Sequence, residues 1–292
     1  MLVRKRYEAA ILNQRGVKAF TLQRHRFDAL GRPEVLQEDL DLLLEVRHPN
    51  EPLFDVLVVD EFHNWSTEFI DVACSLWTGE DCLCTYDEHQ AMMFWAGAVK
   101  DVKSELHGIM GVTLFPTLTE NRRSTPEIVK VLNTVVPREM HSSDDPLTDA
   151  FKYRPGKFHI ERCTNFEDEM RFVYNVLMDG YEDVQILART SSICRRASAF
   201  LEGYNVPHTL YLKGDRPPGK KTDIIIQTVH TAQGTGHVSV FLLSCNQGVL
   251  PYSYTIGEHN VFYVACSRAI RDLFISYYGN RSEFLNGLWR CA

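Results

Sequence analysis

The sequence of 292 residues lacks several features that mark common protein classes. Positive charge is not in excess: 31 Lys and Arg stand against 38 Asp and Glu, so the net charge is −7. This balance argues against a surface that binds nucleic acid indiscriminately, although a local basic groove is compatible with it. No apolar run approaches the roughly 18 residues of a membrane span, and the first residues lack the apolar core of a signal peptide. We therefore expect an intracellular, cytoplasmic protein with no membrane contact, the nucleus remaining an alternative.

Paired cysteine motifs are also absent. The eight cysteines are scattered without a C-x-x-C pair, so we expect reduced, mostly buried thiols rather than a zinc site. The sequence has no internal repeat and no low-complexity tract. Its 45% content of hydrophobic residues is ample for packed cores, and its length predicts about two globular domains.

A phosphate-binding loop of the form G-x-x-x-x-G-K-[ST] is missing, although the stretch GDRPPGKKT (214–222) imitates its spacing. Such a loop works because successive backbone N–H groups point at phosphate oxygens at the start of a helix. Pro217 and Pro218 have no N–H to offer, and Lys221 stands where a Ser or Thr would bind magnesium. A β-branched strand pattern follows instead of a helix. We interpret the stretch as a surface turn between two strands.

Apolar strand patterns alternate with amphipathic helix patterns along most of the chain. This alternation predicts the α/β class with mainly parallel sheets, two of them with a break near 110–120. We expect strands at 54–59, 81–87, 157–163, 184–190, 207–212, 223–229, 238–244 and 272–278, helices at 34–46, 67–77, 98–110, 167–178, 193–204 and 259–270, and a stretch at 111–136 that turns from strand to helix with Ser124 or Thr125 as its N-cap.

The sharpest chemical pattern is VVDEFHNW (58–65). Asp60 and Glu61 end a buried strand, where one carboxylate can hold magnesium through water and the other can polarise an attacking water. An ordinary acidic helix start is the alternative interpretation.

Four further blocks each have an ordinary alternative when taken alone. Gln90 and Trp95 lie in YDEHQAMMFWAGA (86–98), where an amide can sense a phosphate and an aromatic ring can stack on a base. Arg122 and Arg123 lie in LTENRRSTPEIV (118–129), His230 in QTVHTAQGTG (227–236), and Arg268 in VFYVACSRA (261–269). Taken alone, Trp95 is as readily a core residue, and Arg122 and Arg123 are more often a solvated charge pair. His230 is more often a hydrogen-bonded polar residue, and Arg268 can simply form a buried ion pair.

In sequence order, these blocks and VQILART (184–190) resemble helicase motifs II to VI of the UvrD/Rep-type superfamily-one helicases. The resemblance covers roughly residues 50–278. It implies a RecA-like P-loop NTPase helicase fold, with an incomplete first RecA-like domain at 1–112 and a second at 113–292. It also implies an ATP-driven translocase on single-stranded DNA, with ATP and Mg²⁺ as cofactors. The turn at GDRPPGKKT stands where larger relatives carry an accessory domain, so we expect no large insertion.

The resemblance also implies roles for individual residues. Asp60 would be the magnesium-associated acid and Glu61 the general base, while Gln90 would couple the γ-phosphate to the DNA site. Arg123 and Arg268 would neutralise charge on the γ-phosphate from the second domain. The nucleic-acid contacts would be a base stacked on Trp95 and a backbone beside Thr228 and His230.

Departures from the family pattern bear on activity. His63 and Asn64 replace the usual Gln-Asp, Met93 and Ala96 replace an aromatic residue and an arginine beside Trp95, and Gln233 and Gly236 replace a lysine and a glutamate. Only 59 residues precede Asp60, and none supplies the phosphate-loop lysine. We therefore expect weak or absent ATP binding and no hydrolysis by this chain alone. The missing part would come from a longer gene or a partner polypeptide.

Three hypotheses remain at this point. The chain is a portion of an active helicase, or it is a degenerate module that binds nucleic acid or a partner without turnover. A nuclease-associated accessory subunit is the third and weakest.

Overall fold

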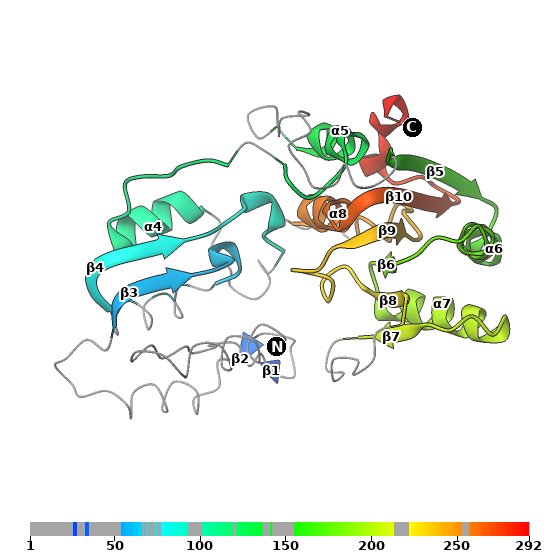
Figure 1. Ribbon diagram of the computed structural model, residues 1–292, viewed down its shortest axis with the longest axis horizontal. Helices are drawn as coiled ribbons and strands as arrows, with labels where there is room; N and C mark the ends of the chain where they lie inside the picture. Colours follow the sequence, from blue (N-terminus) through cyan, green and yellow to red (C-terminus); the bar gives the residue numbers. More distant parts are fainter. Residues whose placement is uncertain are drawn as a thin grey trace. The chain divides into compact units, whose positions relative to one another are not determined.

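The computed structural model shows two compact units, residues 1–116 and 117–292 (Figure 1). It describes residues 26–27, 33–34, 54–65, 67, 70, 74, 77–92, 101–118, 121–136, 141, 155–212, 222–252 and 257–291. The predicted domain boundary after residue 112 is close to the division between the units. Most of GDRPPGKKT (214–222) lies outside the described residues.

The second unit is built on a six-stranded sheet in which all paired neighbours are parallel. Its order is β5 (Lys157–Cys163), β10 (Ala269–Tyr278), β9 (His237–Leu242), β6 (Val184–Ala188), β8 (Ile224–Thr228) and β7 (Thr209–Tyr211). The predicted α/β class with a mainly parallel sheet is therefore confirmed.

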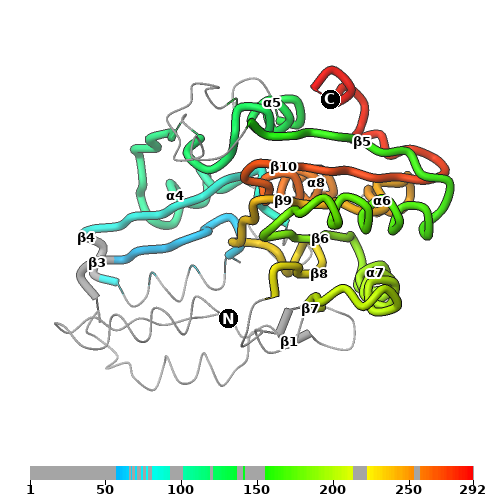
Figure 2. Tube along the Cα trace, turned by 45° about the vertical axis from the view of Figure 1, so that its right-hand side comes forward, coloured from blue at the N-terminus to red at the C-terminus, as the bar shows by residue number. Residues whose placement is uncertain are grey.

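The direction of each crossover fixes which face of this sheet a helix covers. The chain passes from β5 through α6 (Phe166–Met178) to β6, and then through α7 (Ser191–Gly203) to β7, moving the same way across the sheet. From β9 through α8 (Glu258–Ser267) to β10 it moves back. Because such crossovers are right-handed, α8 covers the opposite face from α6 and α7. α5 (Pro126–Val135) packs against α8, β10 and β5, and Figures 1 and 2 show it at the β5 end of the sheet.

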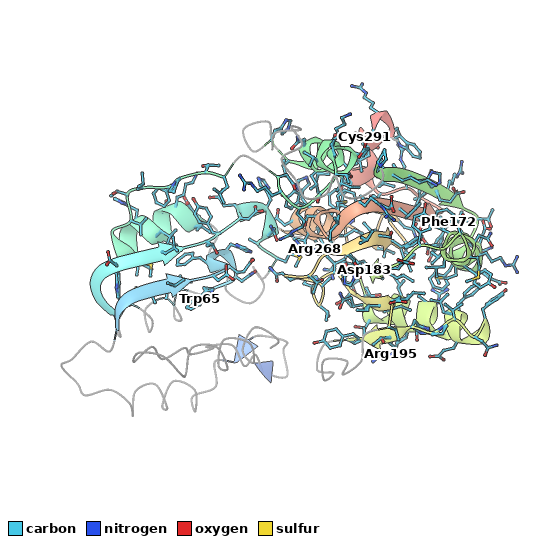
Figure 3. The ribbon with its side chains drawn as sticks, in the orientation of Figure 1. Trp65, Phe172, Asp183, Arg195, Arg268 and Cys291 are labelled. Carbon is cyan, nitrogen blue, oxygen red and sulfur yellow. The ribbon has the colours of Figure 1, made fainter. Side chains whose placement is uncertain are left out.

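Aromatic side chains fill the core between the sheet and the α6–α7 layer. Phe241 on β9 and Phe274 on β10 are stacked, with ring centroids 4.7 Å apart and planes at 16°. Phe172 on α6 meets both rings edge-on (Figure 3). Both sheet rings are almost fully buried, so this cluster ties β9, β10 and α6 together.

The first unit contains the parallel pair β3 (Phe54–Val59) and β4 (Trp77–Cys84) and α4 (Val102–Met110). α4 begins at the N-cap Asp101, whose side chain accepts from the Ser104 N–H, and ends at Gly111 in the left-handed conformation. Two 3-10 turns, η1 (Phe62–Asn64) and η2 (Glu88–Gln90), follow the strands, and a short antiparallel pair joins β1 (Arg26–Phe27) to β2 (Pro33–Glu34).

One expected strand is wrong. Residues 111–118 form no strand, because the side chains that made the pattern apolar lie in solvent: Leu114 is 79% exposed and Leu118 96%. Pro116 within the run also removes a ladder donor. The helical half of the same stretch forms as predicted, with Thr125 as the N-cap of α5. Among the described residues, no helix is both long and apolar enough to cross a membrane.

A fully buried carboxylate, Glu169 on α6, is held by the residue that follows β9. Its two oxygens accept from the Ser244 backbone N–H at 2.7 Å and from the Ser244 hydroxyl at 2.8 Å. Ser244 has a left-handed backbone, with φ 54°, which turns both donors toward the carboxylate. Burial raises the pKa of Glu169 above its ordinary value, and the bonds from Ser244 oppose that rise only in part.

We predict that Phe241→Ala lowers the free energy of unfolding by about 3–5 kcal/mol, because it removes a buried ring and leaves a cavity. Phe241→Leu, which keeps most of the volume, should cost clearly less. Urea unfolding followed by circular dichroism measures both. A loss below about 1 kcal/mol for the alanine variant would contradict this account of the core.

We also predict that Glu169 makes stability fall as pH rises. The folded pKa is raised, so the folded chain keeps this proton after the unfolded chain has released it, and the stabilisation is lost as pH rises from about 4.3 through the folded pKa. Glu169→Gln should flatten the dependence of the unfolding free energy on pH. Glu167→Gln, on the exposed side of the same helix, is the matched control and should leave the slope unchanged.

Candidate functional site

The carboxyl ends of β3 and β4 bring the first predicted site residues to one edge of their sheet. Asp60 and Glu61 follow β3, and Thr85 follows β4. The Thr85 hydroxyl donates to Asp60 Oδ1 at 2.5 Å. The Glu61 backbone N–H lies 3.1 Å from Asp60 Oδ1 and 3.2 Å from Thr85 Oγ1. One threonine hydroxyl therefore holds both acidic residues in place.

Glu61 occupies the left-handed region, with φ 56° and ψ 42°. This conformation costs a non-glycine residue on the order of 1 kcal/mol or more and persists only where the surroundings fix it. The fixing contacts here are those to Thr85 and the backbone bond from the Phe62 N–H to the Thr85 carbonyl at 2.9 Å. The Glu61 side chain is 46% exposed, while its Oε2 is buried beside His63.

Gln90 is joined to this edge through residues that the sequence interpretation did not select. Its side-chain amide donates to Asp87 Oδ2 at 2.8 Å, and the Asp87 backbone N–H donates to His63 Nδ1 at 3.0 Å. The His63 ring is buried, and its Nε2 lies 3.0 Å from Glu61 Oε2. The structure thus brings together Asp60, Glu61 and Gln90. Asp87 could have been found from the sequence, because it ends the strand expected at 81–87, although β4 itself ends at Cys84.

Trp95 lies outside the described residues, as do Met93 and Ala96. The predicted stacking of a base on Trp95 stays a prediction.

In the second unit, Arg268 lies between the end of α8 and the start of β10 (Figure 3). It is the largest fully buried side chain among the described residues, with 1% exposure. Its guanidinium donates to the carbonyls of Val264 and Thr235, at 3.1 and 2.9 Å, and to the Ser267 hydroxyl at 2.8 Å. In this conformation the guanidinium is engaged within the unit, so reaching a phosphate requires a change of rotamer.

Arg123 lies close to Arg268 at the edge where β9 begins. A β-carbon built at Gly236 would be 3.8 Å from Arg123 Cδ and 3.7 Å from the Arg268 carbonyl oxygen. The Ser124 hydroxyl donates to the Ala269 carbonyl at 2.9 Å, which anchors the segment carrying Arg123 beside β10. Arg123 itself is exposed. The two predicted arginines therefore flank one point, and the gap between them is the position where the family pattern has a glutamate.

The predicted nucleic-acid residues of this unit lie in the turn after β8. Thr228 is nearly buried, and its hydroxyl is 2.8 Å from that of Thr231. His230 is partly exposed two residues further on. The turn ends at Thr235, whose carbonyl accepts from Arg268. Thr228, His230, Arg123 and Arg268 are thus brought into one region of the second unit.

A buried ion pair braces α8, the helix that leads into Arg268. Arg189, at the end of β6, donates through Nη2 to Glu258 Oε1 at 2.5 Å and through Nε to Oε2 at 3.1 Å. The Tyr252 N–H donates to the same carboxylate at 2.9 Å. Glu258 and Tyr252 were missed from the sequence, because the pairing depends on the order of strands in the sheet.

The surroundings of Asp60 fit a magnesium ion held through water rather than a closed metal site. The described residues contain no cluster of three or more His, Cys, Asp or Glu side chains suited to a metal. Asp60 is exposed, and only its Oδ1 takes part in the contacts with Thr85 and Glu61. Mg²⁺ commonly keeps several waters and uses one or two carboxylates, so Asp60 is able to serve in this way.

Comparison with protein families gives a match over residues 212–280, to the model described as UvrD-like helicase C-terminal domain. Residues 212–280 are thus similar to this helicase domain. The match includes the turn after β8, α8 and Arg268, so the recognition of the chain as a UvrD-type C-terminal portion is confirmed. The parallel six-stranded sheet is consistent with a RecA-like fold.

The chain is similar to one curated helicase and to one solved helicase domain. The mitochondrial ATP-dependent DNA helicase HMI1 of Saccharomyces cerevisiae is 22% identical over 191 residues, which is 60% of this chain and 26% of HMI1. The chain thus spans about a quarter of that relative. The crystal structure of the C-terminal domain of a possible DNA helicase from Lactobacillus plantarum WCFS1 is similar at a TM-score of 0.42 and 19% identity, over 56% of this chain and 92% of that one.

We predict that Thr85→Val speeds amide hydrogen exchange at Glu61 by about two- to tenfold, because valine keeps the shape but removes a hydrogen bond worth about 0.5–1.5 kcal/mol. Thr85→Ser should restore the slow rate. Phe62 is the internal control, since its N–H bonds to the Thr85 backbone carbonyl. An unchanged rate at Glu61 would show that the hydroxyl does not hold this turn.

Proposed function

We propose that the chain is a portion of an ATP-dependent DNA helicase of the UvrD type, which couples ATP hydrolysis to movement on single-stranded DNA when the phosphate-loop segment is supplied. ATP with Mg²⁺ is the proposed cofactor, and single-stranded DNA and the segment bearing the phosphate loop are the proposed partners. The observation that carries this proposal is the arrangement at the end of β3. Two adjacent carboxylates lie there: Asp60 is held by the Thr85 hydroxyl, and Glu61 is partly exposed.

The chemistry assigned to this edge follows from its geometry. Mg²⁺, held through water at Asp60, would neutralise phosphate charge when nucleotide is bound. Glu61 is partly exposed, with Oε2 buried near His63, and its carboxylate can accept a proton from a water in line with a phosphate. Gln90 is kept on the same edge by its bond to Asp87, which suits a group that senses the nucleotide.

On the second unit, Arg123 and Arg268 are the proposed cations for the transferring phosphate. Arg123 is exposed, whereas Arg268 must exchange its carbonyl partners for phosphate. The turn carrying Thr228 and His230 is the proposed DNA contact, with Trp95 as the proposed stacking residue.

A second candidate function is a helicase-like binding module that does not turn over ATP. The burial of Arg268 favours it, because its guanidinium is already satisfied by protein acceptors. Gly236 favours it too, since the charge expected between Arg123 and Arg268 is absent. The two functions differ in whether ATP is hydrolysed once a phosphate loop is provided.

We predict that the 292-residue chain alone shows no appreciable DNA-stimulated ATPase activity, because it contains no phosphate-loop lysine. Release of inorganic phosphate, measured with and without single-stranded DNA, tests this. Robust turnover that Glu61→Gln abolishes would refute it. Turnover unaffected by Glu61→Gln would indicate a contaminating enzyme.

We further predict that the chain binds a fluorescent single-stranded oligonucleotide in a salt-dependent manner. His230→Ala should weaken binding by about two- to tenfold, as expected for loss of one polar contact. His159→Ala, a half-exposed histidine on β5, is the matched control. Fluorescence anisotropy at two salt concentrations measures this, and equal effects of the two variants would remove the turn after β8 from the DNA site. Binding without hydrolysis, even after a phosphate-loop segment is joined to the chain, would favour the second candidate function.

A further inference from the structure

His63 lies between two parts of the candidate site that come from different strand ends. It belongs to η1, which follows β3, whereas Asp87 and Gln90 follow β4. Its ring is 1% exposed, so protein groups and not bulk water set its hydrogen bonds.

The backbone fixes which ring nitrogen of His63 carries the proton. The Asp87 N–H donates to Nδ1 at 3.0 Å. A backbone amide can only donate, so Nδ1 is the acceptor and the ring proton is on Nε2. The imidazole therefore accepts on the side of β4 and donates on the side of Glu61.

The Nε2 side of the His63 ring faces Glu61, the proposed general base. Nε2 lies 3.0 Å from Glu61 Oε2, although the carboxylate is off the line of the N–H and the pair does not meet hydrogen-bond geometry. The Glu61 side chain is 46% exposed and can turn. Contacts of this kind are often loose without substrate and align when it is bound.

The Nδ1 side of the His63 ring is connected to Gln90 through Asp87. Asp87 accepts from the Gln90 side-chain amide through Oδ2 at 2.8 Å and from the His89 backbone N–H through Oδ1 at 2.9 Å. Both oxygens of Asp87 are thus engaged, and its own N–H holds the His63 ring. The contacts run in one series from Glu61 through His63 and Asp87 to Gln90.

We infer that His63 is a positioning residue that couples Gln90 to Glu61, so that a shift of Gln90 changes the orientation of the Glu61 carboxylate. The link to catalysis rests on the proposed function, whereas the coupling itself does not. The family pattern has glutamine at this position, and its side-chain amide also offers one acceptor and one donor. His63→Gln is therefore the conservative variant and His63→Leu the variant that removes both groups.

The inference is tested by NMR on the chain as it stands. In a sample with ¹⁵N-labelled histidine, the His63 signals are assigned by their loss in His63→Gln, and we expect the tautomer protonated on Nε2. Protonation on Nδ1 instead would overturn the inference.

The coupling is measured at the Gln90 side-chain amide. Glu61→Gln should shift this signal in the wild-type background, leave it unmoved in His63→Leu, and shift it again in His63→Gln. His107→Gln, the same substitution at an exposed site on α4, should keep the wild-type response. A shift of equal size in His63→Leu would overturn the coupling.

If His63→Leu does not fold, the reverse direction replaces it: Gln90→Ala should move the His63 ring nitrogen signals, and no movement would overturn the inference. None of these measurements needs nucleotide. Coupling without any ATP hydrolysis, once a phosphate-loop segment is joined, would therefore contradict the proposed function and leave the role of His63 in place.

Discussion

Parallel pairing of strands is the constraint on which the candidate sites depend. Because the strands of the β3–β4 pair and of the six-stranded sheet run the same way, their carboxyl ends meet at one edge, and the turns that follow them become neighbours. Asp60 and Thr85 are distant in sequence but in contact for this reason. In the second unit the same constraint places the turn after β8 beside the end of β6, where the Val229 N–H bonds to the Ala188 carbonyl at 3.1 Å.

Much of the fold follows from local pattern. β5 occurs at the predicted residues, 157–163, because its burial alternates along its length. β6 is buried at every position, as a central strand between two helical layers should be, and it was recognisable as an apolar run. The failure at 111–118 has the opposite cause: an apolar pattern predicts a strand only if a neighbour exists to pair with it, and among the described residues these pair with no strand. Strand partners are a property of the whole chain.

The site was recognisable from the sequence where residues follow a strand directly, as Asp60 and Glu61 do, or where they match a motif of the family, as Gln90 in η2 does. His63 was not selected from the sequence, because its role depends on the hydrogen bond from the Asp87 N–H. The pairing of β3 with β4 brings these two residues together. Arg268 was found as a residue type in a motif, but its burial and its carbonyl partners depend on the packing of α8 against the turn that ends at Thr235. Whether these residues act on ATP or DNA stays a prediction.

Some buried ionisable residues of the second unit stabilise the fold independently of any activity. Glu169 and the Arg189–Glu258 pair are enclosed and satisfied, and each joins a helix to a turn at a strand end. Removing one partner of such a group leaves the other unsatisfied in the core, so these residues contribute to stability whatever the chain does. Arg268 is enclosed in the same way, with backbone carbonyls as acceptors. A carbonyl is a neutral acceptor that a phosphate oxygen can replace at a gain in charge complementarity. Because its acceptors are carbonyls, Arg268 can have a structural role and can also become a cation that binds phosphate. The exposed Arg123 close to it supports the phosphate-binding role.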